Sequence, residues 1–111
     1  MKDFTVYSYV NWKGSSGIQY RFEVLQAGNE PTELPGIYIL SKATREGCEA
    51  IYIGQAIDMK RRLRNHEKLR PALQLGVNEI HLMLAPADDE VRKSIESDLI
   101  SRWQPPLNHK G

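Results

Sequence analysis

The segments GIYILS (residues 36–41) and AIYIG (residues 50–54) decide the fold of this 111-residue chain. Both are short runs rich in β-branched and aromatic residues, with glycine at one end, which is typical of strands. The polar residues 42–49 between them predict a loop that joins the two strands into a hairpin. Because side chains alternate along a strand, we expect the isoleucines on one face of the hairpin and the tyrosines on the other.

The two strands contribute one tyrosine each to that second face. Pairing Tyr38 directly opposite Tyr52 centres the hairpin on Arg45 and leaves two phenol groups side by side, flanked by glycines that keep the face open. One interpretation is a cross-strand aromatic pair that stabilises the sheet by roughly 0.2–1 kcal/mol. The other is that the hydroxyl groups hold or deprotonate a water molecule near a phosphate. The pair alone favours the first interpretation, so the rest of the chain must decide.

The residues before these strands predict a separate β-hairpin. Apolar and polar side chains alternate over residues 4–10 and 18–24, on either side of a glycine- and serine-rich turn at 13–17. Residues 27–33 have the composition of a turn-rich linker. We therefore interpret residues 1–33 as a hairpin extension and linker, ahead of a core at residues 34–108, in one domain of residues 1–111.

The residues after the two strands predict the element order β-β-α-β-α. Asp58 is expected to cap a helix from residue 59 to about residue 70, where Pro71 stops it. Residues 79–85 predict a third strand. A long helix then begins at the acidic residues 88–89 and ends before the prolines at 105–106, with an apolar stripe formed by Val91, Ile95 and Leu99. The predicted fold is α/β (α+β), a small three-stranded antiparallel or mixed sheet flanked by helices, with the extra N-terminal hairpin.

Composition bounds the function only loosely. A chain of 111 residues with 41% hydrophobic and 26% charged residues is typical of one globular domain. No segment approaches the ~20 apolar residues of a membrane helix, no secretory signal is recognisable, and Cys48 is the one cysteine, so we expect a cytoplasmic protein with no membrane partner. The net charge is +1, so nucleic-acid binding must rest on where the charges lie.

The predicted helix at residues 58–70 has the strongest charge bias in the chain. It carries six basic residues against the acidic Asp58 and Glu67, and the basic ones are Lys60, Arg61, Arg62, Arg64, Lys68 and Arg70. Most charge runs are only solvated helix faces. However, Arg62 and His66 are four residues apart and are expected on one face, and a permanent cation beside a histidine suits a phosphate in a reacting complex.

Glu96 lies beside the apolar stripe of the last predicted helix. One interpretation is an ion pair with Arg92 four residues earlier, which would contribute only a few tenths of a kcal/mol. The other is a magnesium ligand, because a hard divalent cation often takes one or two carboxylates and completes its shell with water and phosphate oxygens.

Taken together, these residues resemble the GIY-YIG nuclease domain. Both name-giving tripeptides are present at residues 36–38 and 52–54, and the resemblance covers roughly residues 34–108. The further matching positions are Arg62, His66, Glu96 and Asn108. The pattern is similar to the N-terminal incision domain of bacterial nucleotide-excision repair and to restriction and homing endonucleases of this family.

The resemblance implies a metal-dependent endonuclease that hydrolyses phosphodiester bonds in DNA. It assigns Mg²⁺, with Mn²⁺ as a substitute, to Glu96, and the deprotonation or positioning of the attacking water to Tyr38. Tyr52 would orient water or phosphate, and Arg62 would stabilise the charge that develops on the phosphate. His66 would either activate Tyr38 or bind phosphate. Asn108 would brace the site, and the nucleic acid would lie on Lys60, Arg61, Arg64, Lys68 and Arg70.

Two other classes of function remain open from the sequence. A non-catalytic nucleic-acid-binding module could use the basic helix at 58–70 without cutting, and an α/β interaction protein could use the tyrosine pair structurally. RNA is not excluded as the substrate. Target choice is left to the N-terminal hairpin, a partner protein or a homodimer.

Overall fold

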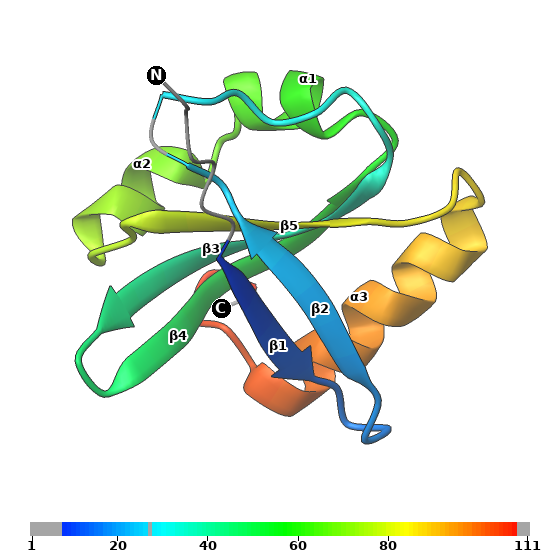
Figure 1. The fold of residues 1–111 in the computed structure, drawn as a ribbon, viewed down its shortest axis with the longest axis horizontal. Coiled ribbons are helices and arrows are strands. Elements are labelled where there is room, and N and C mark those ends of the chain that lie inside the picture. Colours follow the sequence, from blue (N-terminus) through cyan, green and yellow to red (C-terminus); the bar gives the residue numbers. More distant parts are fainter. Residues whose placement is uncertain (1–7, 27, 109–111) are drawn as a thin grey trace, which may run out of the picture.

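The computed structural model describes residues 8–26 and 28–108, which form one five-stranded sheet with helices on both faces (Figure 1). The strand order is β1-β2-β5-β3-β4, and every pairing is antiparallel. Helices α1 and α2 cover one face, and α3 covers the other. The elements are β1 (Tyr9–Lys13), β2 (Gln19–Val24), β3 (Gly36–Thr44), β4 (Gly47–Ala56), α1 (Met59–Arg64), α2 (Leu69–Gln74), β5 (Glu79–Leu84) and α3 (Asp89–Trp103).

The N-terminal hairpin is part of the main sheet, so the prediction of a three-stranded sheet with a separate hairpin is wrong. Strand β2 pairs with β5 at Glu23 and Leu82, and the Leu25 N–H donates to the Ile80 carbonyl at 2.9 Å. These partners lie far apart in the chain, and local alternation carries no information on such pairing. The first strand of the hairpin was predicted at residues 4–10. Residues 4–7 lie outside the described residues, and the structure has β1 at Tyr9–Lys13.

The central hairpin has a different register from the predicted one. Tyr38 pairs with Gly54 and Leu40 pairs with Tyr52, so the two tyrosines are diagonal neighbours and not directly opposite. A bulge between Leu40 and Ser41 leaves Ile51 as an extra residue. Ile51 therefore packs on the tyrosine face, with α1 and α2, and not with the other isoleucines.

The predicted helix at residues 59–70 is two short helices. Asp58 caps α1 as expected, because its side chain accepts the Arg61 N–H at 2.9 Å. The chain leaves the helix at Asn65, and Pro71 lies in the first turn of α2 rather than ending a helix. Proline is tolerated there because the N–H groups of a first turn have no partner within the helix. His66 thus lies in the segment between the helices and does not share a helix face with Arg62.

Helix α3 has its predicted ends but not its predicted buried stripe. Asp88 caps it by accepting the Glu90 N–H, and the left-handed Gln104 (φ 45°) ends it before the prolines. Leu99 is buried, but Val91 is 38% exposed. Arg92, next in the chain, is 3% exposed and faces the sheet in its place. No helix among the described residues is long and apolar enough to cross a membrane.

The turn between β1 and β2 is fastened to α3 through Asp98. The Asp98 carboxylate accepts hydrogen bonds from the Ser16 N–H and hydroxyl, at 2.8 and 2.6 Å, and from the Tyr20 hydroxyl at 2.7 Å. A Cβ atom at Gly14 would overlap this carboxylate, so only glycine permits the approach. The N-terminal hairpin is therefore hydrogen-bonded both to the rest of the sheet and to α3, the helix that carries Glu96.

Candidate active site

The glycines of the two tripeptides allow close packing around the site. A Cβ atom at Gly36 would overlap the Met59 side chain, so this glycine lets α1 pack directly on β3. A Cβ atom at Gly54 would overlap the phenol ring of Tyr38. Glycine at this position therefore makes the space in which that ring lies. The sequence predicted that the tyrosine face is open. This prediction is wrong, because Tyr38 is only 1% exposed.

Tyr38 forms a short hydrogen bond with His66. The Tyr38 Oη atom and the His66 Nε2 atom are 2.6 Å apart, and the Lys68 N–H donates to His66 Nδ1 at 3.0 Å. Burial first, and then the Arg62 charge, lower the pKa of His66 to about 4, so the ring is neutral at physiological pH. A neutral ring carries one proton, and the Lys68 N–H requires Nδ1 to be an acceptor. Nε2–H therefore donates to the Tyr38 oxygen.

Tyr52 completes an aromatic group with these two residues. Its ring centroid lies 5.0 Å from that of His66 and 6.2 Å from that of Tyr38. Burial raises the pKa of both tyrosines, so both are neutral phenols in the free protein. The Arg62 charge opposes this rise and the Glu96 charge adds to it. Arg62 and Glu96 thus act in opposite directions on the pKa of the two phenols.

Arg62 forms a bidentate ion pair with Glu67. Its Nη1 and Nη2 atoms donate to the two carboxylate oxygens, each at 2.9 Å. The pairing holds the pKa of Glu67 at about 2 and raises that of Arg62. The arginine predicted to contact a phosphate is thus held by a carboxylate that the sequence did not single out.

Glu96 has the properties expected of a metal ligand. Burial raises the pKa of this half-buried carboxyl group, and Lys93 opposes the rise. Within the described part of the chain, no hydrogen bond or ion pair engages its carboxylate, so the alternative interpretation, an ion pair with Arg92, does not hold. A divalent cation would offset the cost of burying this charge, and one carboxylate with water and phosphate oxygens suits Mg²⁺. The donor set therefore fits the metal that the resemblance implies.

Arg92 instead fastens α3 to the end of β4. Its guanidinium donates to the Gln55 side chain at 2.8 Å, to the carbonyls of Pro86 and Ala87, and to Asp89. Gln55 follows the second tripeptide directly. Arg92 thus fixes the helix one turn before Glu96, a role that the sequence analysis missed. A basic residue one turn from the predicted ligand was the available signal.

Asn108 braces β4 beside the site. Its amide group accepts the Ile53 N–H and donates to the Ile53 carbonyl, both at 2.8 Å. Together with the bond from the Leu107 N–H to the Ile51 carbonyl, these contacts cover the outer edge of the strand. The contacts are of the kind predicted for Asn108, while its part in a reaction stays a prediction.

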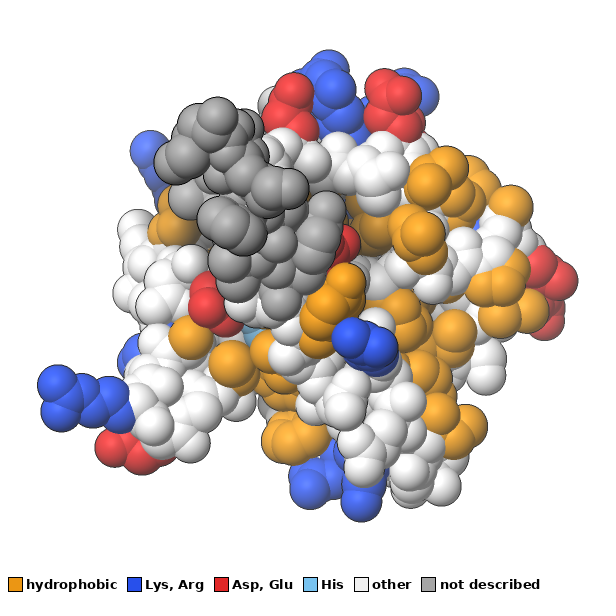
Figure 2. Space-filling view, in the orientation of Figure 1, with side chains coloured by type: hydrophobic (Ala, Val, Ile, Leu, Met, Phe, Trp, Pro, Cys, Tyr) orange, Lys and Arg blue, Asp and Glu red, His pale blue; other side chains and the backbone are white. Residues whose placement is uncertain are grey.

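The basic residues of the predicted binding surface are spread over α1, α2 and the segment between them. Arg61, Arg64 and Arg70 are exposed, Lys68 is partly exposed, and Lys60 pairs with Glu30 at 3.7 Å. Arg64 and Arg70 line a hollow of about 590 Å³ that reaches His66. Acidic side chains lie among the basic ones at the α1 edge of the molecule (Figure 2), so this surface is not uniformly positive.

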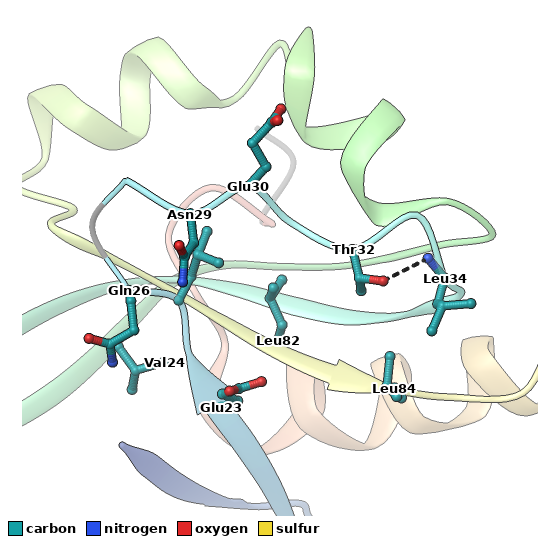
Figure 3. Close-up of a pocket in the computed structure, with 10 residues that line it drawn as sticks. Glu23, Val24, Gln26, Asn29, Glu30, Thr32, Leu34, Leu82 and Leu84 are labelled. Atoms are coloured by element: carbon teal, nitrogen blue, oxygen red, sulfur yellow. Dashed lines mark hydrogen bonds between the residues drawn. The ribbon is translucent and has the colours of Figure 1, made fainter. Parts of the chain in front are cut away.

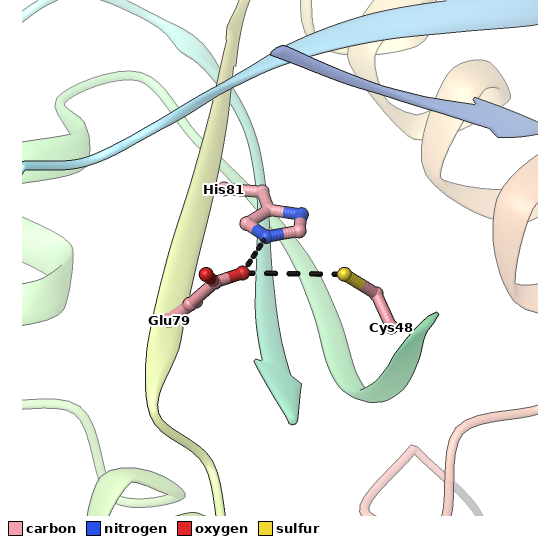
Figure 4. A group of neighbouring side chains, drawn as sticks. All are labelled: Cys48, Glu79 and His81. Carbon is pink, nitrogen blue, oxygen red and sulfur yellow. Dashed lines mark hydrogen bonds and ion pairs between the residues drawn. The ribbon is translucent and has the colours of Figure 1, made fainter. Parts of the chain in front are cut away.

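A second titratable cluster lies on the α3 side of the sheet. Ligand atoms of Cys48, Glu79 and His81 lie within 4.8 Å of one another (Figure 4), so the three could be considered a metal site. However, the Trp12 indole N–H donates to His81 Nδ1 at 2.9 Å. The Nε2 atom must then keep its proton, which it donates to Glu79 at 2.9 Å. In this arrangement His81 offers no lone pair to a metal, and the cluster does not fit one.

The hollow drawn in Figure 3 is separate from these groups. It has a volume of about 470 Å³ and lies between β5, β2 and the segment after β2. Leu34 and Leu84 on its wall are 52% and 62% exposed. None of the predicted catalytic residues lines it.

The structure resembles solved structures of an endonuclease domain. It matches two structures of the GIY-YIG N-terminal endonuclease domain of UvrC from Thermotoga maritima, both tyrosine-to-phenylalanine point mutants bound to the catalytic divalent cation. The TM-score is 0.57 for each, the identities are 26% and 25%, and the match covers 71% of this chain and 87% of that chain. No family model matches the sequence, and no curated protein does.

The fold is an α/β domain similar to the endonuclease domain of those two structures. The chain belongs to the GIY-YIG superfamily, as the two tripeptides and the matched structures agree.

Proposed function

We propose that this protein is a metal-dependent endonuclease that hydrolyses phosphodiester bonds in DNA. The observation that carries the proposal is the Tyr38–His66 hydrogen bond on the face of the sheet that α1 covers, with Arg62 of α1 and Glu96 of α3 both acting on the pKa of Tyr38. The UvrC domain binds its catalytic divalent cation in the same fold, which supports metal dependence here.

In this mechanism Tyr38 first loses its own proton to solvent as substrate binds, and the resulting phenolate takes a proton from the attacking water. The His66 Nε2–H donates to the phenolate oxygen and stabilises that form, and the Arg62 charge also favours it. Tyr38 is 1% exposed in the free protein, so the segment that holds His66 must shift as substrate binds. Tyr52, which is partly exposed, orients the water or the phosphate.

Two charged groups stabilise the charges that develop during cleavage. Arg62 donates to the phosphate oxygens and compensates their growing negative charge. Glu96 would hold the divalent cation, which would supply positive charge to stabilise the phosphate and the leaving group. Mg²⁺ is the expected ion because the donor is a single hard carboxylate, with Mn²⁺ as a substitute.

The substitution Glu96→Ala tests the metal assignment directly. We expect it to abolish cleavage and to remove a Mn²⁺ site that can be followed by the paramagnetic signal of the bound ion. Glu90→Ala is the matched control, because Glu90 is an exposed carboxylate on the first turn of the same helix. A well-folded Glu96→Ala protein that binds Mn²⁺ and cleaves as the parent does would contradict the assignment.

A further inference from the structure

Glu67 has no role in the proposed reaction, but its carboxylate binds the Nη1 and Nη2 atoms of Arg62, which a phosphate would also bind. The two bonds of 2.9 Å run in parallel from Nη1 and Nη2 to the two carboxylate oxygens. Guanidinium groups bind phosphate with the same fork and the same spacing. The free protein therefore already holds an anion at the group proposed to receive the substrate.

The Glu67 carboxylate and a substrate phosphate would also repel each other electrostatically. Arg62 and Glu67 together carry no net charge, so the pair attracts a phosphate less than Arg62 alone would. A phosphate that reached the remaining N–H groups of Arg62 would also lie close to the Glu67 carboxylate, and like charges repel at such distances. Binding is therefore stronger when Glu67 leaves.

Glu67 is free to leave at little cost. Its side chain is 63% exposed, so water can solvate the released carboxylate, and exposed ion pairs contribute little to stability. It also lies between His66 and Lys68, in the segment whose backbone orients the imidazole. Release of Glu67 therefore begins in the same segment that must shift to admit substrate to Tyr38.

We propose that Glu67 is an internal competitor for Arg62, whose carboxylate a backbone phosphate of the nucleic-acid substrate displaces. The inference rests on the proposed function, because it takes Arg62 as the phosphate contact. It assigns to Glu67 an effect on substrate affinity and none on the rate once substrate is bound. The contact involves only the sugar–phosphate backbone, so the effect is the same for every base sequence.

Glu67→Gln tests this by removing the charge and keeping the size. Affinity for a fluorescent DNA duplex, measured at low salt with EDTA to prevent cleavage, should rise by about three- to tenfold. Glu30→Gln is the matched control, because Glu30 also neutralises a basic residue of α1 but through one contact of 3.7 Å with Lys60. This control should change affinity by less than about twofold. Thermal unfolding confirms that each variant is folded.

A double-mutant cycle separates competition from the mere loss of a negative charge. In an Arg62→Ala background, Glu67→Gln should tighten binding no more than Glu30→Gln does, because nothing is left to compete for. The single-turnover rate of Glu67→Gln at saturating DNA with Mg²⁺ should stay within about twofold of the parent.

Each of the following results would overturn the proposal: unchanged or weaker binding by Glu67→Gln, equal tightening in the Arg62→Ala background, or a tenfold or greater fall in the saturating rate. The last would make Glu67 a support that orients Arg62. A parent that binds the duplex and never cleaves it overturns the proposed function alone. A parent and a Glu67→Gln variant that both fail to bind overturn this proposal too.

Discussion

The two faces of the sheet each hold a buried histidine in the same tautomer, and they differ in what surrounds it. The Lys68 N–H fixes His66 on the α1 face, and the Trp12 indole fixes His81 on the α3 face. In both rings Nε2–H is the donor, to a phenol in the first case and to the Glu79 carboxylate in the second. A fixed tautomer therefore does not by itself identify a reactive site.

The neighbours of the phenol distinguish the two faces. Arg62 and Glu96 both act on the pKa of Tyr38, and no described residue forms a hydrogen bond or ion pair with the Glu96 carboxylate. On the other face, Trp12, His81 and Glu79 satisfy one another. Around Tyr38, the Glu96 carboxylate is available to bind a metal. Around His81, the polar side chains are satisfied by hydrogen bonds to one another. We therefore assign chemistry to Tyr38 and its neighbours and none to the cluster around His81.

Of the substitutions that test this difference between the two faces, Arg62→Ala is expected to have the largest effect on the cleavage rate. Loss of charge stabilisation at the phosphate should lower the single-turnover cleavage rate by about a thousandfold or more. The free energy of unfolding should change by less than about 1 kcal/mol, because the pair with Glu67 is exposed. Cleavage that persists in a folded variant would remove Arg62 from the mechanism.

Tyr38→Phe should lower the cleavage rate by about a hundredfold or more, because it removes the proposed base. It also leaves the His66 Nε2–H without its acceptor, at a cost of about 1–3 kcal/mol in unfolding free energy. Tyr52→Phe is the comparison, and a smaller loss of rate is expected for it. If Tyr52→Phe were the more damaging substitution in rapid-quench measurements, the proton would pass to Tyr52 instead.

Trp12→Phe addresses the other face. It removes the donor to His81 Nδ1 and should lower the unfolding free energy by about 1–3 kcal/mol in denaturant titrations. The cleavage rate per folded molecule should not change. A selective loss of activity in a stable variant would show that the cluster around His81 takes part in the reaction.

His66→Gln should have the smallest effect, on the pH dependence of stability. Burial lowers the pKa of His66 from its ordinary value of 6.5 to about 4, so the folded protein resists protonation of this ring. Its contribution is complete above pH 6.5 and is lost as the pH falls from 6.5 towards 4. The parent should therefore lose more stability over this range than His66→Gln. Parallel curves for the two proteins would show that His66 titrates normally.

The sequence predicted the family and the fold class better than the way the chain brings its residues together. The two tripeptides with Arg62, His66 and Glu96 indicated the family and its fold class, and the structural matches agree. The pairing of Tyr38 with Gly54 and the bulge at Ile51 were not predicted, because a two-residue shift leaves the alternation of the faces unchanged.

The other differences between the predicted and the observed structure also arise from contacts between side chains that the local sequence pattern does not reveal. The pairing of β2 with β5 depends on packing between distant segments. The helix break lies at Asn65, where two weaker helix formers, Asn65 and His66, interrupt a run of good ones, and His66 makes a tertiary hydrogen bond to Tyr38. Glu67 seemed an ordinary acidic residue of a basic helix, and only the geometry of its carboxylate shows that it holds Arg62.

Nicking of a supercoiled plasmid in Mg²⁺ or Mn²⁺, compared with EDTA, tests the central claim most directly. The account predicts that the parent converts the supercoiled form to the nicked circle only when a divalent cation is present, and that Glu96→Ala does not. Plasmid that the protein binds and leaves uncut with every divalent cation tried would contradict the account and favour a module that only binds nucleic acid.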